Sequence, residues 1–184
     1  LEEGNHAQAI SMLTDHLQRE AADYEACNLL MECFFQTDRY ELGEQLAATV
    51  MKQGVVNDCF ENNRFLFRML TGDFSQEFLD NYDKNKITNP FTRLNLDVAT
   101  EDPKCWGLES GPSLKSKLLF QDYRFGTSER RRKAQTMYFD CGDGYTYSFQ
   151  TPLITLGRHG CNNIPFSQNG ISRRHAVIVN HPDD

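Results

Sequence analysis

The chain has 184 residues, of which 39% are hydrophobic, so it is long enough to bury a core and predicts one or two globular domains. No stretch approaches the roughly 20 apolar residues that span a bilayer, and the six cysteines form no C-x-x-C pair. We therefore expect a cytoplasmic protein with reduced thiols, no membrane partner and no cofactor. The net charge of −7 divides into −9 over residues 1–125 and +2 over 126–184, which argues against nucleic-acid binding and predicts two parts with different roles.

A similar short pattern occurs three times in the first half, each time 34 residues after the last. The copies are residues 4–9, 38–43 and 72–77. In each copy a turn-forming pair precedes a ring residue and then a helix-compatible stretch, as expected where one helix ends and its antiparallel partner begins. The period indicates stacked helical hairpins over residues 1–84.

The middle copy is the clearest. Apolar residues at helical spacing predict helices over 24–36 and 40–53, with Gly54 as the C-terminal stop. This hairpin resembles tetratricopeptide repeats in a leucine, two aromatic residues and a small residue: Leu30, Phe34, Tyr40 and Gly43. The resemblance implies that the helices dock a second protein; the alternative is a generic helical hairpin domain whose period is fortuitous.

Residues 85–135 are expected to be an irregular linker or a packed connection, because periodicity fades and prolines and glycines punctuate short apolar pieces. The basic run 128–133 can contact nucleic acid or an acidic partner, but it is short and contains no aromatic residue. A solvated linker is the favoured interpretation.

In residues 136–184 the pattern changes to short β-rich pieces separated by turn signals. Strands are predicted over 137–139, 145–149, 152–156, 164–166 and 175–179. The fold class is therefore α+β and multidomain, with helical hairpins followed by a partial β-sandwich.

Catalysis is not favoured by the residues of this second part. Ser172 and His175 are three residues apart, but the turn around Ser172 lacks the second glycine of a nucleophile elbow and no acid is placed to orient the histidine. Cys141, Cys161 and His159 with His175 have no usual zinc spacing. We expect neither an enzyme nor a metal site.

An anion clamp fits these residues better, because a phosphate is bound well by arginine and hydroxyl donors held at strand ends. Arg158 follows one predicted strand, and Ser172 with Arg173 precedes another. Adjacent loops at one end of a sheet would bring the three side chains together, while His175 would pin its loop by hydrogen bonds.

At residues 154–158, 162–164 and 171–178 the chain resembles a forkhead-associated domain. That resemblance implies a β-sandwich whose loops bind phosphothreonine in a partner protein. It places the phosphate-contacting arginine at Arg158, the phosphate-contacting serine at Ser172 and a neighbouring loop contact at Arg173. It also assigns three loop-shaping positions: Gly157, Asn163 and His175.

The family continues with further strands and with a loop whose asparagine holds the phosphopeptide backbone, whereas this sequence ends at Asp184. We expect either a piece of a longer protein or a strand-exchanged homodimer that completes the sandwich. The leading hypothesis is a signalling adaptor that binds a threonine-phosphorylated partner and docks a second protein on its helices. The alternative is a structural scaffold whose second domain binds no phosphopeptide.

Overall fold

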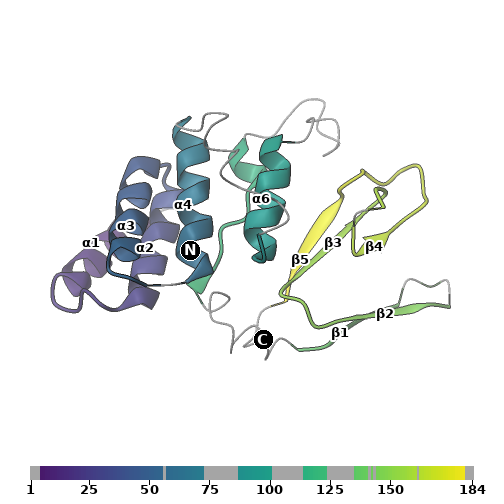
Figure 1. The fold of residues 1–184 in the computed structure, drawn as a ribbon, viewed down its shortest axis with the longest axis horizontal. Helices are drawn as coiled ribbons and strands as arrows, with labels where there is room; N and C mark the ends of the chain where they lie inside the picture. The colour runs from purple at the N-terminus through teal and green to yellow at the C-terminus, as the bar shows by residue number, and fades with distance from the viewer. Residues whose placement is uncertain are drawn as a thin grey trace.

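The computed structural model has an α+β architecture in which helices come first and short strands follow (Figure 1). This agrees with the predicted fold class. The structure describes the following residues: 5–55, 57–72, 87–100, 114–123, 135–140, 142, 144–160 and 162–180. Among them, no helix combines the length and the apolar character that crossing a membrane requires.

Four helices form the first part of the chain: α1 (His6–Leu17), α2 (Tyr24–Gln36), α3 (Tyr40–Lys52) and α4 (Asp58–Thr71). The starts of α1 and α3 lie 34 residues apart, and so do the starts of α2 and α4. Neighbouring helices pack as antiparallel hairpins (Figure 1). The predicted repeat is therefore confirmed for these helices, and the second helix expected in the third copy lies outside the described residues.

Local capping fixes where these helices begin and end. The Asp23 side chain accepts a hydrogen bond from the Ala26 N–H at the start of α2, and Asn57 accepts one from the Cys59 N–H at the start of α4. Each cap satisfies an N–H that the first helical turn leaves without a partner. Gly54 and Gly72 have φ of 81° and 74° after α3 and α4, a left-handed conformation that favours glycine at a helix end.

The helices share an apolar core whose largest members are aromatic. Phe60, Phe65 and Phe67 of α4 are fully buried, and Phe67 packs directly over Gly43 of α3. A Cβ atom at position 43 would lie 2.2 Å from the Phe67 ring, so the close packing of α3 on α4 requires glycine there.

The segment expected to be irregular contains a helix, α6 (Pro90–Thr100), and that part of the expectation was wrong. Asn89-Pro90 looked like a helix breaker, but Asn89 Oδ1 accepts the Phe91 N–H at 3.0 Å and Pro90 occupies the first helical position. An N-cap asparagine followed by proline starts a helix as readily as it stops one. Lys117 ends a further single turn of 3₁₀ helix, Leu114–Lys117.

Residues 118–123, here called the strap, run extended between α4 and α6 (Figure 1). Three buried asparagines from three helices bind the strap backbone. Asn95 Oδ1 accepts the Leu119 N–H at 2.8 Å and its Nδ2 donates to the Leu119 carbonyl at 2.9 Å. Asn63 does the same to Gln121 at 2.9 and 2.8 Å.

Asn28 of α2 completes this arrangement by accepting the Tyr123 N–H at 2.9 Å and donating to the Gln121 carbonyl at 3.1 Å. Alternate strap residues are therefore each held through the backbone. Between them, Phe120 packs against Phe35 and Phe67. We call the surface formed by Asn28, Asn63 and Asn95 the asparagine face, and the strap fills it.

The described strands form two small sheets. Strands β1 (Met137–Asp140) and β2 (Thr146–Phe149) pair antiparallel, and β3 (Leu153–Gly157) lies between β4 (Ile164–Pro165) and β5 (Ala176–Val179). Strand β5 is antiparallel to β3, whereas the short β4 is parallel to it. The predicted strands are present within a residue or two, and a sandwich formed from them stays a prediction.

The β3–β5 sheet contacts the helices through α6. Phe91 and Leu94 of α6 form an apolar cluster with Leu153 of β3, and Leu119 of the strap and Val177 of β5 pack against it. The predicted boundary near residue 135 therefore separates segments that are in direct contact.

Candidate functional site

Strands β3 and β5 bring the predicted site residues together at one end of the sheet. Their antiparallel register pairs Leu156 with Ala176, and the pairing continues beyond the strands. The Arg158 N–H donates to the Ser172 carbonyl at 2.9 Å, and the His159 N–H donates to the Arg173 carbonyl at 2.9 Å. Arg158 and Ser172 are thus directly opposite each other, and Arg173 is the next residue along the same rim.

Gly157, the last residue of β3, allows the two loops to approach closely. A Cβ atom built there would lie 2.4 Å from the Arg173 carbonyl oxygen and 2.9 Å from the Arg174 Cα. At Gly160, in the same loop, an added Cβ would meet nothing within 4 Å. The backbone contact therefore requires glycine at 157 and not at 160.

Asn162 clips the two loops to each other. Its buried side-chain Nδ2 donates to the His159 carbonyl at 2.7 Å and to the Arg173 carbonyl at 2.8 Å. The motif at residues 162–164 contained this asparagine, but the sequence analysis chose its neighbour. Only the fold reveals the role of Asn162, because both of its partners are backbone carbonyls.

Asn163, the predicted loop-shaping residue, holds the other side of the turn to β3. Its Oδ1 accepts hydrogen bonds from the Thr155 N–H at 2.9 Å and from the Thr155 hydroxyl at 3.0 Å. The Thr155 hydroxyl oxygen also accepts the Asn163 N–H at 3.1 Å. His175 contributes through its backbone, since its N–H donates to the Leu156 carbonyl at 2.8 Å while its side chain is exposed.

The rim is open and rich in cationic side chains. Arg158 and Arg173 are exposed and Ser172 is half-buried, so two guanidinium groups and a hydroxyl can reach one ligand from adjacent loops. Arg174 has a different environment: its Nη2 lies 3.5 Å from Asp97 Oδ2 of α6, and their side chains are only 11% and 21% exposed. Arg174 therefore anchors the loop to the helices.

The chemistry available at this rim is hydrogen-bond donation to an anion. Guanidinium and hydroxyl groups donate, and phosphate oxygens accept in charge-assisted hydrogen bonds that are stronger than neutral ones. In the part of the chain that the structure describes, no three His, Cys, Asp or Glu side chains gather as a metal site would require. Cys141 and Cys161, considered as zinc ligands, lie outside that part.

Comparison with protein families matches residues 1–57 to the model described as tetratricopeptide repeat. Residues 1–57 are tetratricopeptide-like. This is the segment in which the structure shows helices repeating every 34 residues. Such repeats stack into surfaces that bind other proteins, and they indicate a role in protein–protein interaction.

No curated protein matches the chain. Among solved structures, the chain is similar to Mycobacterium tuberculosis EmbR in complex with a low affinity phosphopeptide, with 16% identity and a TM-score of 0.32. The match covers 96% of this chain and 39% of the EmbR chain, so this chain spans about two fifths of that length. A TM-score of this size does not assign a shared fold, and the resemblance of residues 154–178 to a forkhead-associated domain stays a prediction.

Proposed function

We propose that this protein is a non-catalytic adaptor that binds a phosphothreonine of one partner at the β3–β5 rim and docks a second protein on its helices. The first activity is assigned to Arg158, Ser172 and Arg173. Gly157, Asn162, Asn163 and His175 hold the loops that present them.

The observation that carries the proposal is the pairing of Arg158 with Ser172 across the end of the sheet. The two residues are 14 positions apart in sequence, and they would have been on opposite ends if the strands had paired in another direction. A phosphoryl group placed over this rim receives donors from both loops without any rearrangement of the backbone. Preorganised donors of this kind lose little entropy on binding.

The test is a titration of the protein with one peptide in its phosphothreonine and unmodified forms. We expect the phosphorylated peptide to bind more tightly. Arg158→Ala should remove about 1.5 to 3 kcal/mol of that difference, since it deletes a charge-assisted hydrogen bond. Arg19→Ala, an exposed arginine after α1, is the control that changes net charge equally and should leave the difference unchanged.

Equal affinity for the two peptides, or equal losses in both variants, would reject the phosphothreonine site. A phosphoserine version of the peptide addresses specificity, because no described residue at the rim decides between the two hydroxyl amino acids.

The second candidate is a structural scaffold, and the contact between the sheet and α6 favours it. The Phe91–Leu94–Leu153 cluster fixes the β-strands to the helices without any use of the rim. In a scaffold, Arg158→Ala and Ser172→Ala would leave assembly intact, whereas apolar changes such as Leu46→Asp in the helices would abolish it.

A further inference from the structure

The asparagine face cannot receive a second protein while the strap occupies it. Six hydrogen bonds of 2.8 to 3.1 Å join Asn28, Asn63 and Asn95 to strap backbone groups. Gln121 is only 1% exposed and its side-chain Oε1 accepts from Asn89 Nδ2 at 2.7 Å. An extended partner peptide would have to displace a segment that is already tethered at the site. A docking surface must therefore be sought elsewhere on the helices.

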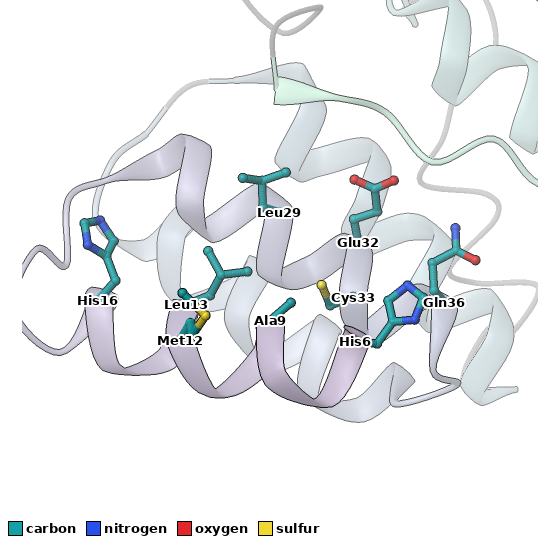
Figure 2. Close-up of a pocket in the computed structure, with 9 residues that line it drawn as sticks. All are labelled: His6, Ala9, Met12, Leu13, His16, Leu29, Glu32, Cys33 and Gln36. Atoms are coloured by element: carbon teal, nitrogen blue, oxygen red, sulfur yellow. The ribbon is translucent and has the colours of Figure 1, made fainter. Parts of the chain in front are cut away.

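A hollow between α1 and α2 provides one. It has a volume of about 710 Å³, and Figure 2 shows its lining side chains on the facing sides of the two helices. Ala9, Met12 and Leu13 of α1 face Leu29 and Cys33 of α2. Met12 and Leu29 are 64% and 47% exposed, which is unusual for side chains that line one apolar hollow.

The 34-residue repeat shows what this hollow fits. The positions one repeat later in α3 and α4 are covered by α2, which contacts both helices. Leu13 corresponds to Ala47, which is fully buried, and Cys33 corresponds to Phe67, which is also fully buried. The α1–α2 hollow is therefore the next unit of the same stacking interface, and the occupant of that interface is a helix.

Side-chain size explains why the unit is hollow. In α3 and α4 the bulky Phe67 fills the space beside Gly43. The equivalent pair is Ala9 and Cys33, and the cysteine is much smaller than phenylalanine. The occupant must then supply the missing bulk as an aromatic or large aliphatic side chain, as an anchor residue does at a protein interface.

We infer that the α1–α2 hollow is the docking site for an amphipathic helix of a partner protein, with one apolar stripe and a bulky anchor that inserts beside Ala9 and Cys33. This rests on the proposed function in one respect, namely that the helices dock a second protein. Helix-in-groove recognition uses apolar residues at i, i+3 or i+4 and i+7, the pattern by which α2 itself packs on α3 and α4. Polar residues at the ends of the hollow, His6, His16 and Gln36, leave the ends of such a helix in a wet environment.

The probe is a fluorescent peptide with the sequence of residues 23–37, because α2 fills the equivalent site one repeat later. We expect saturable binding to the full chain. Met12→Glu should weaken it about tenfold or more by placing a charge in the apolar stripe. Leu42→Glu is the matched control, since Leu42 is 44% exposed but does not line the hollow, and it should bind the peptide as the native protein does.

The outcomes separate the possible occupants. Absence of saturable binding to the native chain overturns the inference, and so does equal weakening by Met12→Glu and Leu42→Glu. If sedimentation shows a dimer that Met12→Glu dissolves, the occupant is a second copy. If a longer form of the protein with residues before Leu1 no longer binds the probe, the helix is supplied within the same chain. Either result overturns the partner assignment.

Failure of this inference is distinguishable from failure of the proposed function. The probe titration contains no phosphopeptide, so Arg158→Ala should leave probe binding unchanged whether or not the rim binds phosphothreonine. Probe binding that survives Met12→Glu and also Leu29→Glu would mean that the helices dock a helical segment at another place. Circular dichroism of each variant should show the native helix content, because both substituted side chains are exposed.

Discussion

Two neighbouring amides, Asn162 and Asn163, have opposite hydrogen-bonding roles. Asn162 acts as a donor to two carbonyl oxygens, whereas the Asn163 side chain acts as an acceptor from Thr155. An aspartate has the same shape as asparagine but only accepts hydrogen bonds when ionised. The two positions should therefore respond differently to the same conservative substitution.

We expect Asn162→Asp to destabilise the protein by about 1 to 3 kcal/mol, because the carboxylate faces two carbonyl oxygens and donates to neither. Asn163→Asp keeps its acceptor role and should stay within about 0.5 kcal/mol of the native protein. Urea unfolding of both variants at pH 7 measures the difference. Equal stability of the two variants would contradict the roles assigned to these amides.

At the scale of secondary structure elements, the strap joins α2, α4 and α6 through backbone hydrogen bonds. Asn95→Ala removes the acceptor of the Leu119 N–H and leaves a poorly solvated donor, which costs about 1 to 3 kcal/mol. Hydrogen exchange should show faster exchange at the Leu119 amide together with the loss of stability. An unchanged exchange rate at Leu119 would mean that the strap is held by its side chains alone.

The N-cap of α2 predicts a pH dependence. The Ala26 N–H and, secondly, the His16 side chain lower the pKa of Asp23 from its ordinary value. A carboxylate whose pKa is lower in the folded state stabilises the protein above its unfolded pKa of about 3.9, and this contribution disappears as the pH falls through the folded pKa. Asp23→Ala should cost about 1 kcal/mol at pH 7.

The unfolding free energies of native protein and Asp23→Ala should converge as the pH is lowered from 7 to 3. Asp15→Ala, which removes an exposed carboxylate from α1, should follow the native protein at both pH values. A cost of Asp23→Ala that stays constant down to pH 3 would show that the ionised carboxylate is not what caps the helix.

At the scale of the whole molecule, the helices and the β3–β5 sheet are coupled through α6. Leu94→Ala should open a cavity against Leu153 and cost about 2 to 5 kcal/mol. If the contact stabilises the sheet, the amides of β3 and β5 should exchange faster in this variant than in the native protein. Exchange rates in β3 and β5 that do not change would show that the two parts are stable independently.

The helical part was largely predictable, because repeat length and capping residues are local signals. The strap was not, since Leu119, Gln121 and Tyr123 are bound through backbone groups that every residue carries. Their partners come from three helices, and no spacing rule in the sequence connects them. Buried polar side chains such as these show their role only once the partner backbone is in place.

The site was predictable to the extent that a motif recorded it. Gly157, Arg158 and Ser172 belong to short patterns whose spacing indicates two loops at one end of a sheet. The ion pair of Arg174 with Asp97 was missed, because it joins residues 77 positions apart and depends on how α6 lies against the sheet. Helix α6 itself was missed when Asn89-Pro90 was interpreted as a break.

The most direct test of the account follows the backbone amides at the rim while a phosphothreonine peptide is added. In ¹⁵N–¹H spectra of the full chain, we predict concentration-dependent shifts centred on Arg158, Ser172 and Arg173, with small changes in α1 to α4 and none on addition of the unmodified peptide. Shifts elsewhere in the molecule, or identical shifts with both peptides, would contradict the claim that these two loops form a phosphate-binding rim.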